Sequence, residues 1–533
     1  MQKSAYSRLR LASAAALTGL LAFAFTAVNI GTLPGLRMDE AWFGLDALAI
    51  RDHGLFTPYA SNWYTCTLYP WIIAQVFSVF HPGVIALRMP GVILNSIVAA
   101  LAAYVAGSIA GWGGFAAATA LMLSPFYLLF ARHAYEVSAL QNLFTLCAVC
   151  AAIAAARRER FGLIPAAILI SACCLAVANH IIALAIPMGL SFGFVLYGIY
   201  TGDKRFDRTT ILFLFNMAAC AVLTVIKKLF VPLFYRMGIT MEQKCGFYPE
   251  IPRQMPAWTG HAGLIIFLLI ALPIAMAVAI WKFQEELGGL YSRLAAPLRM
   301  SKMFRTTALW LGALGLLSFL WFHSISFLGC LGGFNIFKFF FSLDIGALPA
   351  IVLILCAAVI TGHIFSAAIA CVRHHECDSE KLSIAITLLG TFAAFTALRN
   401  TPIQRYYIIP FMVFTAAACV FLPEYYADKR HRPFAAITAV CFLFCTVVMI
   451  KEITKPATRP PLMFRNGWHA EDSLDQLPNN AFFTRMRENH LCVDSDIGQI
   501  SLVSKFYYTA NPWTCAGHYC ASWNDYFAPE MSR

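Results

Sequence analysis

Two adjacent carboxylates, Asp39 and Glu40, stand shortly after the first long apolar run of the chain. Residues 41–50 follow them with apolar side chains at helical spacing, which is typical of an amphipathic helix at a membrane interface. Ionisable groups at that depth lose hydration and are functional candidates. The alternative is a helix cap, because unpaired amides and the helix dipole favour an acid at a helix start.

Cationic side chains fall on the same predicted side of the membrane as this carboxylate pair. They are Arg88, Arg132, Lys227, Lys228, Lys244, Arg253, Lys338 and Arg405. Guanidinium and ammonium groups fixed at a site bind anions, whereas contact with solvent or lipid headgroups is the alternative for each of them. Lys227 and Lys228 end an apolar run on the outside, against the usual charge bias, which favours anion binding there.

Histidines and one glutamate complete the polar candidates. His133 and Glu136 lie in a short predicted outside loop. They could shape a binding site or support a base, and a plain polar loop is the alternative. His180, His323 and His363 stand alone within apolar runs, and we expect hydrogen-bonded packing roles for them.

The composition requires a membrane around these residues. Of 533 residues, 60% are hydrophobic and only 12% are charged, far from the usual balance of soluble proteins. Runs of roughly 20 apolar residues cross a bilayer as helices. We predict such spans at residues 11–30, 85–110, 115–131, 137–156, 162–179, 181–200, 210–230, 261–281, 306–328, 343–365, 382–398, 406–422 and 433–450. The net charge of +12 sits in short loops without interleaved aromatic residues, so no nucleic-acid partner is expected.

The basic clusters set the orientation of the chain. ARRER, TGDKRFDR and ADKRHRP all fall on the cytoplasmic side when the N-terminus is inside, as the positive-inside rule requires. An odd number of spans then places the polar tail 452–533 outside. The sequence therefore predicts an all-α polytopic membrane core at 1–451 and a small C-terminal α/β domain at 452–533. Residues 31–69 form the first outside loop, and the proline- and aromatic-rich residues 231–260 form a lid.

Short motifs occur along the core in a characteristic order. They are Met38-Asp39-Glu40-Ala41, Leu68-Tyr69-Pro70-Trp71, Ala86-Leu87-Arg88-Met89-Pro90, Leu123-Ser124-Pro125, Arg132-His133-Ala134-Tyr135-Glu136 and the Arg405-Tyr406 pair that precedes Pro410. This order resembles the GT-C glycosyltransferases, in particular the branch of the protein O-mannosyltransferases and the lipid A aminoarabinose transferase. The chain departs from that branch at Cys66-Thr67-Leu68-Tyr69-Pro70, where the family commonly has Lys-Pro-Pro.

The resemblance implies a GT-C fold of about 13 transmembrane helices, and an activity. The donor would be a sugar on a polyprenyl phosphate. The acceptor would be lipid A or lipopolysaccharide, a cell-envelope glycan, another lipid or a protein, on the periplasmic side of a bacterial inner membrane. Asp39 would be the general base of one inverting displacement, with Glu40 orienting Asp39 or the acceptor. Substrate binding would fall to Arg88, Arg132, His133, Glu136, Lys227, Lys228, Arg405 and Tyr406.

No cofactor is expected for this chemistry. A leaving monophosphate carries less charge than a nucleotide diphosphate, and no Asp-x-Asp pair lies in a predicted outside loop. Asp494 and Asp496 have that spacing, but they lie in the tail, where we do not expect a metal. The sequence leaves a divalent metal open.

Two other functions fit a polytopic chain surrounded by membrane lipids. One is a transporter or flippase of lipid-linked sugars, and the other is a catalytically inactive relative that binds lipid-linked sugar. Transporters tend to carry paired inverted repeats and broken helices, and the sequence shows neither.

The tail offers a test of the predicted topology. Its cysteines are Cys492, Cys515 and Cys520. We predict an outside tail with one disulfide, Cys515–Cys520, because an oxidising compartment favours the bond. Cys492 is the alternative partner, and Cys66 with Cys245 in outside loops is a second candidate pair. A membrane-impermeant alkylating reagent should label one tail cysteine of intact cells before reduction and all three after it. Labelling that requires opened membranes would place the tail inside.

Overall fold

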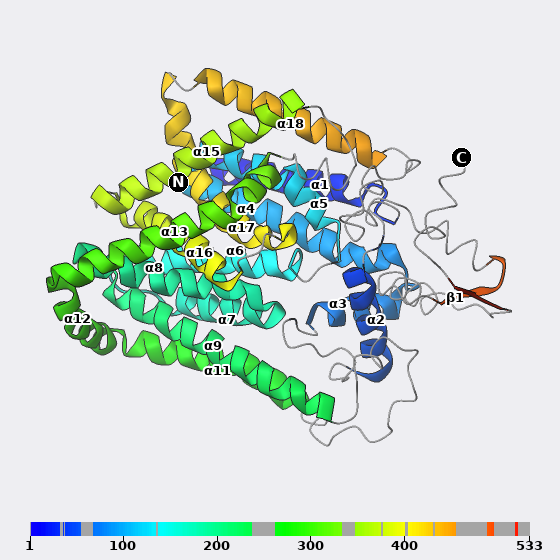
Figure 1. The fold of residues 1–533 in the computed structure, drawn as a ribbon, viewed down its shortest axis with the longest axis horizontal. Coiled ribbons are helices and arrows are strands. Elements are labelled where there is room, and N and C mark those ends of the chain that lie inside the picture. The colour runs from blue at the N-terminus through cyan, green and yellow to red at the C-terminus, as the bar shows by residue number, and fades with distance from the viewer. Residues whose placement is uncertain are drawn as a thin grey trace.

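The structure of the protein is a computed structural model. It describes residues 2–31, 36, 38–54, 65, 68–134, 137–236, 262–332, 347–374, 377–399, 403–429, 432–454, 488–494 and 517–520. The described chain is almost entirely helical (Figure 1). This follows from the composition, because helices satisfy every backbone polar group within an apolar segment.

The helices follow one another with short connections through most of the core. Their bounds are α1 Gln2–Ala27, α2 Met38–His53, α3 Leu68–Val79, α4 Val84–Met122, α5 Pro125–Ala131, α6 Leu140–Ala156, α7 Leu163–Asn179, the 3-10 helix η2 Ile181–Leu184, α8 Ala185–Thr201, α9 Asp207–Arg236, α11 Ala262–Lys282, α12 Gln284–Met300, α13 Lys302–Leu331, α15 Ala347–His374, α16 Ser379–Leu398, the 3-10 helix η4 Gln404–Tyr407, α17 Ile408–Ala427 and α18 Arg432–Thr454.

Among the described residues, eight helices are long and apolar enough to cross a membrane. Shorter apolar helices lie at Leu68–Val79, Leu140–Ala156, Leu163–Asn179, Ala271–Lys282 and Ala436–Val448. Each predicted span thus coincides with helix along much of its length. An integral membrane protein is confirmed, whereas the number of thirteen crossings stays a prediction.

The helix α4 contains a reversal that the sequence analysis placed between two spans. Ala110 and Gly111 have non-helical backbone angles, and Gly111 adopts a φ of +64°, which side-chain-bearing residues rarely adopt. A Cβ built on Gly107 would lie 3.2 Å from the Cβ of Phe115. Eight residues of straight helix rise about 12 Å, so the chain turns back on itself here.

The core of the bundle is α17. In an apolar stretch of 18 residues within Arg405–Ala427, 89% of the residues are buried, against 28% in the corresponding stretch within Lys302–Leu331 of α13. Figure 1 shows α17 among α4, α6 and α16, with α13 and α15 toward the outside. Trp321 and Ile325 of α13 are 84% and 82% exposed. Apolar side chains exposed on such a scale are expected to face lipid.

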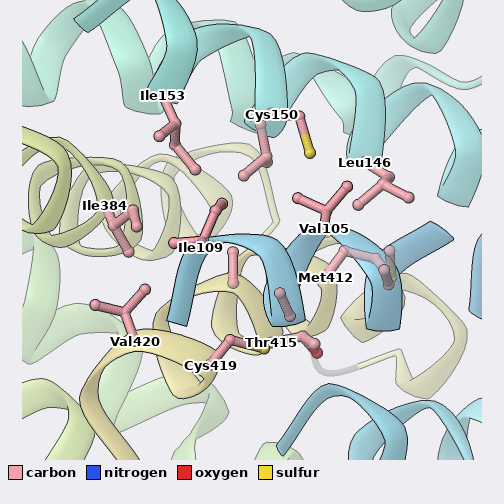
Figure 2. A pocket seen from close by; sticks show the side chains of 14 residues that line it. Val105, Ile109, Leu146, Cys150, Ile153, Ile384, Met412, Thr415, Cys419 and Val420 are labelled. Carbon is pink, nitrogen blue, oxygen red and sulfur yellow. The ribbon is translucent and has the colours of Figure 1, made fainter. Parts of the chain in front are cut away.

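A small apolar cavity of about 40 Å³ lies between α4, α6, α16 and α17 (Figure 2). Val105, Cys150, Ile384 and Met412 line it together with other apolar side chains. Thr415 supplies a hydroxyl to the lining, but that hydroxyl already donates to the Phe411 carbonyl at 2.8 Å, so the space offers little to hydrogen-bond a water molecule. It is a packing defect of the helix core and carries no functional chemistry.

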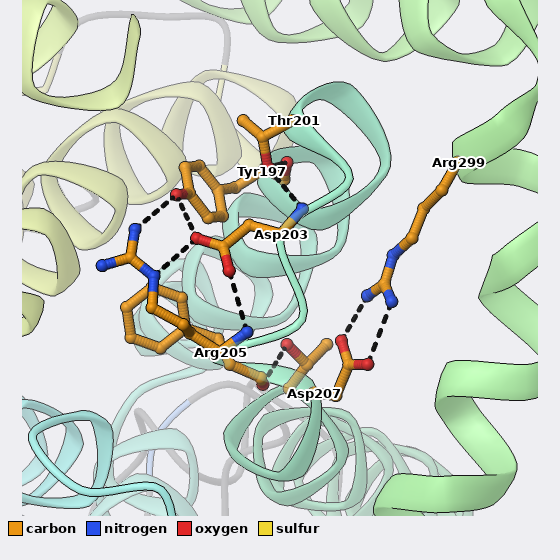
Figure 3. Close-up of polar contacts among 8 residues, drawn as sticks. Tyr197, Thr201, Asp203, Arg205, Asp207 and Arg299 are labelled. Carbon is orange, nitrogen blue, oxygen red and sulfur yellow. Dashed lines mark hydrogen bonds and ion pairs between the residues drawn. The ribbon is translucent and has the colours of Figure 1, made fainter. Parts of the chain in front are cut away.

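The predicted cytoplasmic face is held by a polar cluster (Figure 3). Arg299 of α12 forms a two-pronged ion pair with Asp207, the first residue of α9. Nearby, Asp203 accepts hydrogen bonds from Tyr197 Oη and Arg205 Nε, each at 2.8 Å. The ion pair of Arg299 and Asp207 is nearly buried, with 4% and 9% of the two side chains exposed. It fixes α12 against the connection between α8 and α9.

The helix α12 occupies a stretch that we predicted only as a cytoplasmic loop, 282–305. It exposes Leu290 and Leu294 by 46% and 66% and carries acids in its first turn. Such an amphipathic helix lies in the plane of a membrane interface. The sequence analysis missed it because its apolar positions are too few to read as a span.

Cys371 and Cys377 form a disulfide across the connection between α15 and α16, with Cα atoms 5.7 Å apart. This connection lies on the predicted cytoplasmic side, where thiols are normally kept reduced. In a reducing compartment the two residues would be neighbouring thiols. The alkylation of the tail cysteines described above tests the predicted topology, and with it the side of the membrane on which this connection lies.

The described part of the tail is one parallel strand pair, β1 Leu491–Asp494 and β2 Gly517–Cys520. The register sets Cys492 opposite His518 and Asp494 opposite Cys520. The predicted strand within 497–508 and Cys515 lie outside the described residues. The C-terminal α/β domain and its disulfide therefore stay predictions, as does the lid, of which only 231–236 is described, as the end of α9.

Candidate active site

The helix α2 opens with the two carboxylates in its first turn. Consecutive residues of an α-helix point about 100° apart, so Asp39 and Glu40 face different neighbours. Glu40 turns into the protein and is fully buried, whereas the Asp39 side chain is 30% exposed. The two carboxylates are adjacent in the sequence, but the helix directs them into different environments.

Glu40 is held by a buried two-pronged ion pair. Arg88 of α4 donates from Nε to Oε1 at 2.9 Å and from Nη2 to Oε2 at 2.7 Å. The backbone amide of Ala134 donates to Oε1 at 2.7 Å. Neither side chain of the pair is exposed to solvent. These contacts tie α2 to the N-terminal part of α4 and to the segment that follows α5.

The environment decides the charge of Glu40. Burial by itself raises the pKa of this carboxyl, but the charges of Arg88 and His133 and the hydrogen bonds from Arg88 and the Ala134 amide outweigh it. The pKa of Glu40 therefore lies below its ordinary value. Glu40 is a buried carboxylate, not a proton carrier.

Two arginines also secure the end of the first span. Arg88 Nη1 donates to the Ile30 carbonyl at 2.9 Å. Arg132 donates to the carbonyls of Phe25 and Val28 at 3.0 and 2.6 Å. Cations at a helix C-terminus bind its unpaired carbonyls and complement the helix dipole. Arg88 and Arg132 are buried to 0% and 1% exposure, so these contacts give both a structural role, and the substrate contacts predicted for them stay predictions.

Asp39 has a different partner. Arg405 Nη1 of η4 forms an ion pair with Asp39 Oδ2, and the Arg405 side chain is 24% exposed. The two residues are 366 positions apart in the sequence. No described residue donates a hydrogen bond to the other oxygen, Oδ1. The structure thus brings together the predicted base and one predicted phosphate ligand.

Tyr406 is the centre of this site. The guanidinium carbons of Arg405 and Arg399 lie 5.2 Å and 5.4 Å from the centre of its ring, within cation–π range. The His180 ring centre lies 5.1 Å from the same ring. His180 also pairs with Thr65 in an antiparallel β-bridge, which brings the first outside loop to η2.

His323 of α13 contacts the two residues that flank the site, Tyr407 and Arg399. Its ring nitrogens are 3.1 Å from the Tyr407 hydroxyl and 2.7 Å from the carbonyl of Arg399. It therefore satisfies a carbonyl at the end of α16 and joins three helices. The predicted hydrogen-bonded packing role of His323 is confirmed.

The remaining predicted residues are only partly described. His133 is buried, and its Nδ1 lies 3.0 Å from the Leu129 carbonyl, so it caps α5 from within the scaffold. Lys227 and Lys228 belong to α9, but their side chains lie outside the described part of the structure. Glu136 is outside the described residues altogether. Their predicted substrate contacts stay predictions.

One residue of the site, Arg399, was not among the predicted candidates. It follows a predicted span only six residues before Arg405, and its place next to the Arg-Tyr motif was the available signal. His180 was predicted to have a hydrogen-bonded packing role, and its Nδ1 accepts a hydrogen bond from the Ile182 amide at 3.1 Å, which confirms that role. Within the described ranges, no group of three His, Cys, Asp or Glu side chains could hold a metal ion.

No family model matches the chain, and no curated protein matches it. Among solved structures, ArnT from Cupriavidus metallidurans matches in the apo state and bound to undecaprenyl phosphate, at 13% and 14% identity and a TM-score of 0.34 for both. These matches cover 80% and 78% of this chain and 79% of ArnT.

The oligosaccharyltransferase of Archaeoglobus fulgidus matches over more of this chain. The apo form aligns with 97% of this chain, and AglB in complex with an inhibitory peptide and a dolichol-phosphate aligns with 98%. Both matches have 13% identity and cover 63% of that protein, with TM-scores of 0.47 and 0.45. At these identities and TM-scores the likeness assigns no activity to this chain.

Replacing Glu40 tests whether its ion pair is structural. Glu40→Gln leaves the buried guanidinium of Arg88 without a counter-charge, which should lower the free energy of unfolding by about 3 kcal/mol. Because the pKa of Glu40 is lowered, its stabilisation is present above the ordinary value of 4.5 and lost as the pH falls through the folded-state pKa. The difference from the wild type should therefore shrink on acidification below pH 4.5.

Thermal unfolding in detergent across this pH range would measure the effect. Asp52→Asn is the matched control, because Asp52 is on the same helix in an exposed pair with Arg51 and should contribute less than about 1 kcal/mol. A Glu40→Gln deficit that stays constant with pH would contradict the assignment.

Proposed function

We propose that the chain is a membrane glycosyltransferase that moves one sugar from a polyprenyl-phosphate donor to an acceptor hydroxyl on the non-cytoplasmic side. The observation that carries this proposal is the division of the two adjacent carboxylates. Glu40 is buried in the scaffold, and Asp39 is partly exposed beside an arginine from the far end of the chain. One carboxylate is structural, and the other is placed to react.

The proton of the acceptor hydroxyl goes to Asp39. Its Oδ2 is oriented by Arg405, and its Oδ1 accepts no hydrogen bond from the described residues, so Oδ1 is the proton acceptor. As the O–H bond breaks, the acceptor oxygen attacks C1 of the sugar. A correctly placed base contributes about 10²–10⁴-fold to such a step.

The electron pair of the C1–O bond leaves with the lipid phosphate. The attack comes from the opposite face, so one displacement inverts the anomeric centre. The phosphate gains negative charge as the bond breaks, and Arg405 is the described cation that forms an ion pair with the base. Fixed cations of this kind stabilise the charge that develops in the transition state. All atoms and charges balance without a covalent enzyme intermediate or a metal.

The proposed acceptor is a group of the cell envelope, such as lipid A or another glycan, a lipid or a protein, and the proposed location is a bacterial inner membrane with the site facing the periplasm. Purified protein in detergent, supplied with polyprenyl-phosphate sugars and envelope acceptors, should form a glycosylated product. A flippase or an inactive binder would bind or move the donor without making that product.

Asp39→Asn should reduce transfer at least 100-fold, because the amide cannot take the acceptor proton. Expression and thermal stability should stay close to wild type, since Asp39 is partly exposed. Initial rates at saturating donor would measure the loss. Asp52→Asn, on the same helix, is the control and should retain full activity. Retention of more than a tenth of the wild-type rate by Asp39→Asn would remove Asp39 as the base.

Arg405→Ala should weaken donor binding more than acceptor binding, because a charge-assisted contact with phosphate is lost. Arg405→Lys should restore only part of the affinity, since an ammonium cannot make the two-pronged contact of a guanidinium. Separate titrations of donor and acceptor would show the difference. Unchanged donor affinity in Arg405→Ala would assign Arg405 to orienting Asp39 alone.

A further inference from the structure

Arg399 is a cation of the site that the mechanism above does not use. It caps the C-terminus of α16 in an extended conformation. Its carbonyl lies 2.7 Å from His323 Nε2, and its guanidinium carbon lies over the ring of Tyr406. The backbone of Arg399 thus has a structural role, and its side chain reaches into the site.

The charges around Tyr406 do not cancel. Both carboxylates of the α2 motif are already paired, Glu40 with Arg88 and Asp39 with Arg405. No described acidic side chain forms an ion pair with Arg399. Its Nε is buried and has no hydrogen-bond partner within the described part of the chain. Among the described residues, the site therefore carries one guanidinium more than the carboxylates neutralise.

Stacking on Tyr406 does not satisfy this guanidinium. A cation–π contact uses the flat face of the group, whereas its five N–H donors point outward in the plane. Buried donors without acceptors are costly, and a cation near a membrane interface is costlier still. An anion that presents oxygens to the edge of Arg399 would supply both the missing charge and the missing hydrogen bonds.

We infer that Arg399 is a second binding residue for the phosphate of the donor and acts together with Arg405. The two guanidiniums lie against one aromatic ring, so a phosphate beside Tyr406 can contact both. The ligand class is a phosphate ester on a lipid, and free phosphate shares its oxyanion chemistry. This inference rests on the proposed function, because it names a residue for the donor of that reaction.

Direct binding of a C55 polyprenyl phosphate to the full-length protein in detergent micelles tests the inference, with the corresponding polyprenol as the uncharged probe. Arg399→Ala should raise the Kd for the polyprenyl phosphate at least tenfold and leave the Kd for the polyprenol unchanged. Arg399→Lys should lie between Arg399→Ala and wild type. Inorganic phosphate should compete with the lipid phosphate less effectively in Arg399→Ala than in the wild type.

Arg51→Ala is the matched control, because Arg51 is an exposed arginine on the same predicted side, paired with Asp52, and it should bind like wild type. Arg399→Ala keeps the backbone carbonyl that His323 contacts, and its melting temperature reports folding; Arg399→Gln serves in its place if the alanine variant is unstable. If Arg399→Ala and Arg399→Gln bind the polyprenyl phosphate with wild-type affinity while Arg405→Ala binds it more weakly, the role of Arg399 is overturned and the proposed donor is not. A wild-type protein that prefers polyprenol over its phosphate would overturn the proposed donor itself.

Discussion

The buried ion pair between Glu40 and Arg88 is the contact on which the candidate site depends. It joins α2, which lies outside the helix bundle, to the end of α4, and the Ala134 amide adds the end of α5. Removing two charges from water is expensive, and only a geometry that satisfies both groups compensates for it. Here the carboxylate receives three hydrogen bonds, and the position of α2 is fixed as a result. Asp39, the preceding residue, is placed by the same contact.

Magnitudes separate the roles of the two ion pairs. Breaking a buried pair by removing one partner costs about 3–5 kcal/mol, whereas a solvent-exposed pair contributes about 0–1 kcal/mol. Glu40 and Arg88 are fully buried, and Asp39 and Arg405 keep 30% and 24% of their side chains exposed. The first pair is therefore the more costly to break. The second can exchange partners more easily, as the proposed roles of Asp39 and Arg405 require.

Much of the architecture followed from the sequence, because apolar length and basic clusters reflect simple physical requirements of a bilayer. Asp39 and Arg405 were also candidates from the sequence, since each lies in a short motif at the end of a span, and the structure joins them in one ion pair. The partners of the arginines were not visible. Arg88 and Arg132 carry the same charge as Arg405, but tertiary packing directs them to a carboxylate and to helix-end carbonyls. The charge of a side chain can be read from the sequence, but the acceptor that it contacts depends on tertiary packing.

Tyr406 explains why distant segments must converge at this end of the molecule. Its ring is in contact with Arg399 at the end of α16, Arg405 of η4 and His180 at the break before η2. The bridge between His180 and Thr65 brings the first outside loop to the same place. The two cations lose hydration against the ring, which strengthens their attraction for an anion. An aromatic residue at this position thus holds positive charge close to Asp39 without itself neutralising that charge, whereas a carboxylate in its place would neutralise part of the charge on which the proposed phosphate binding depends.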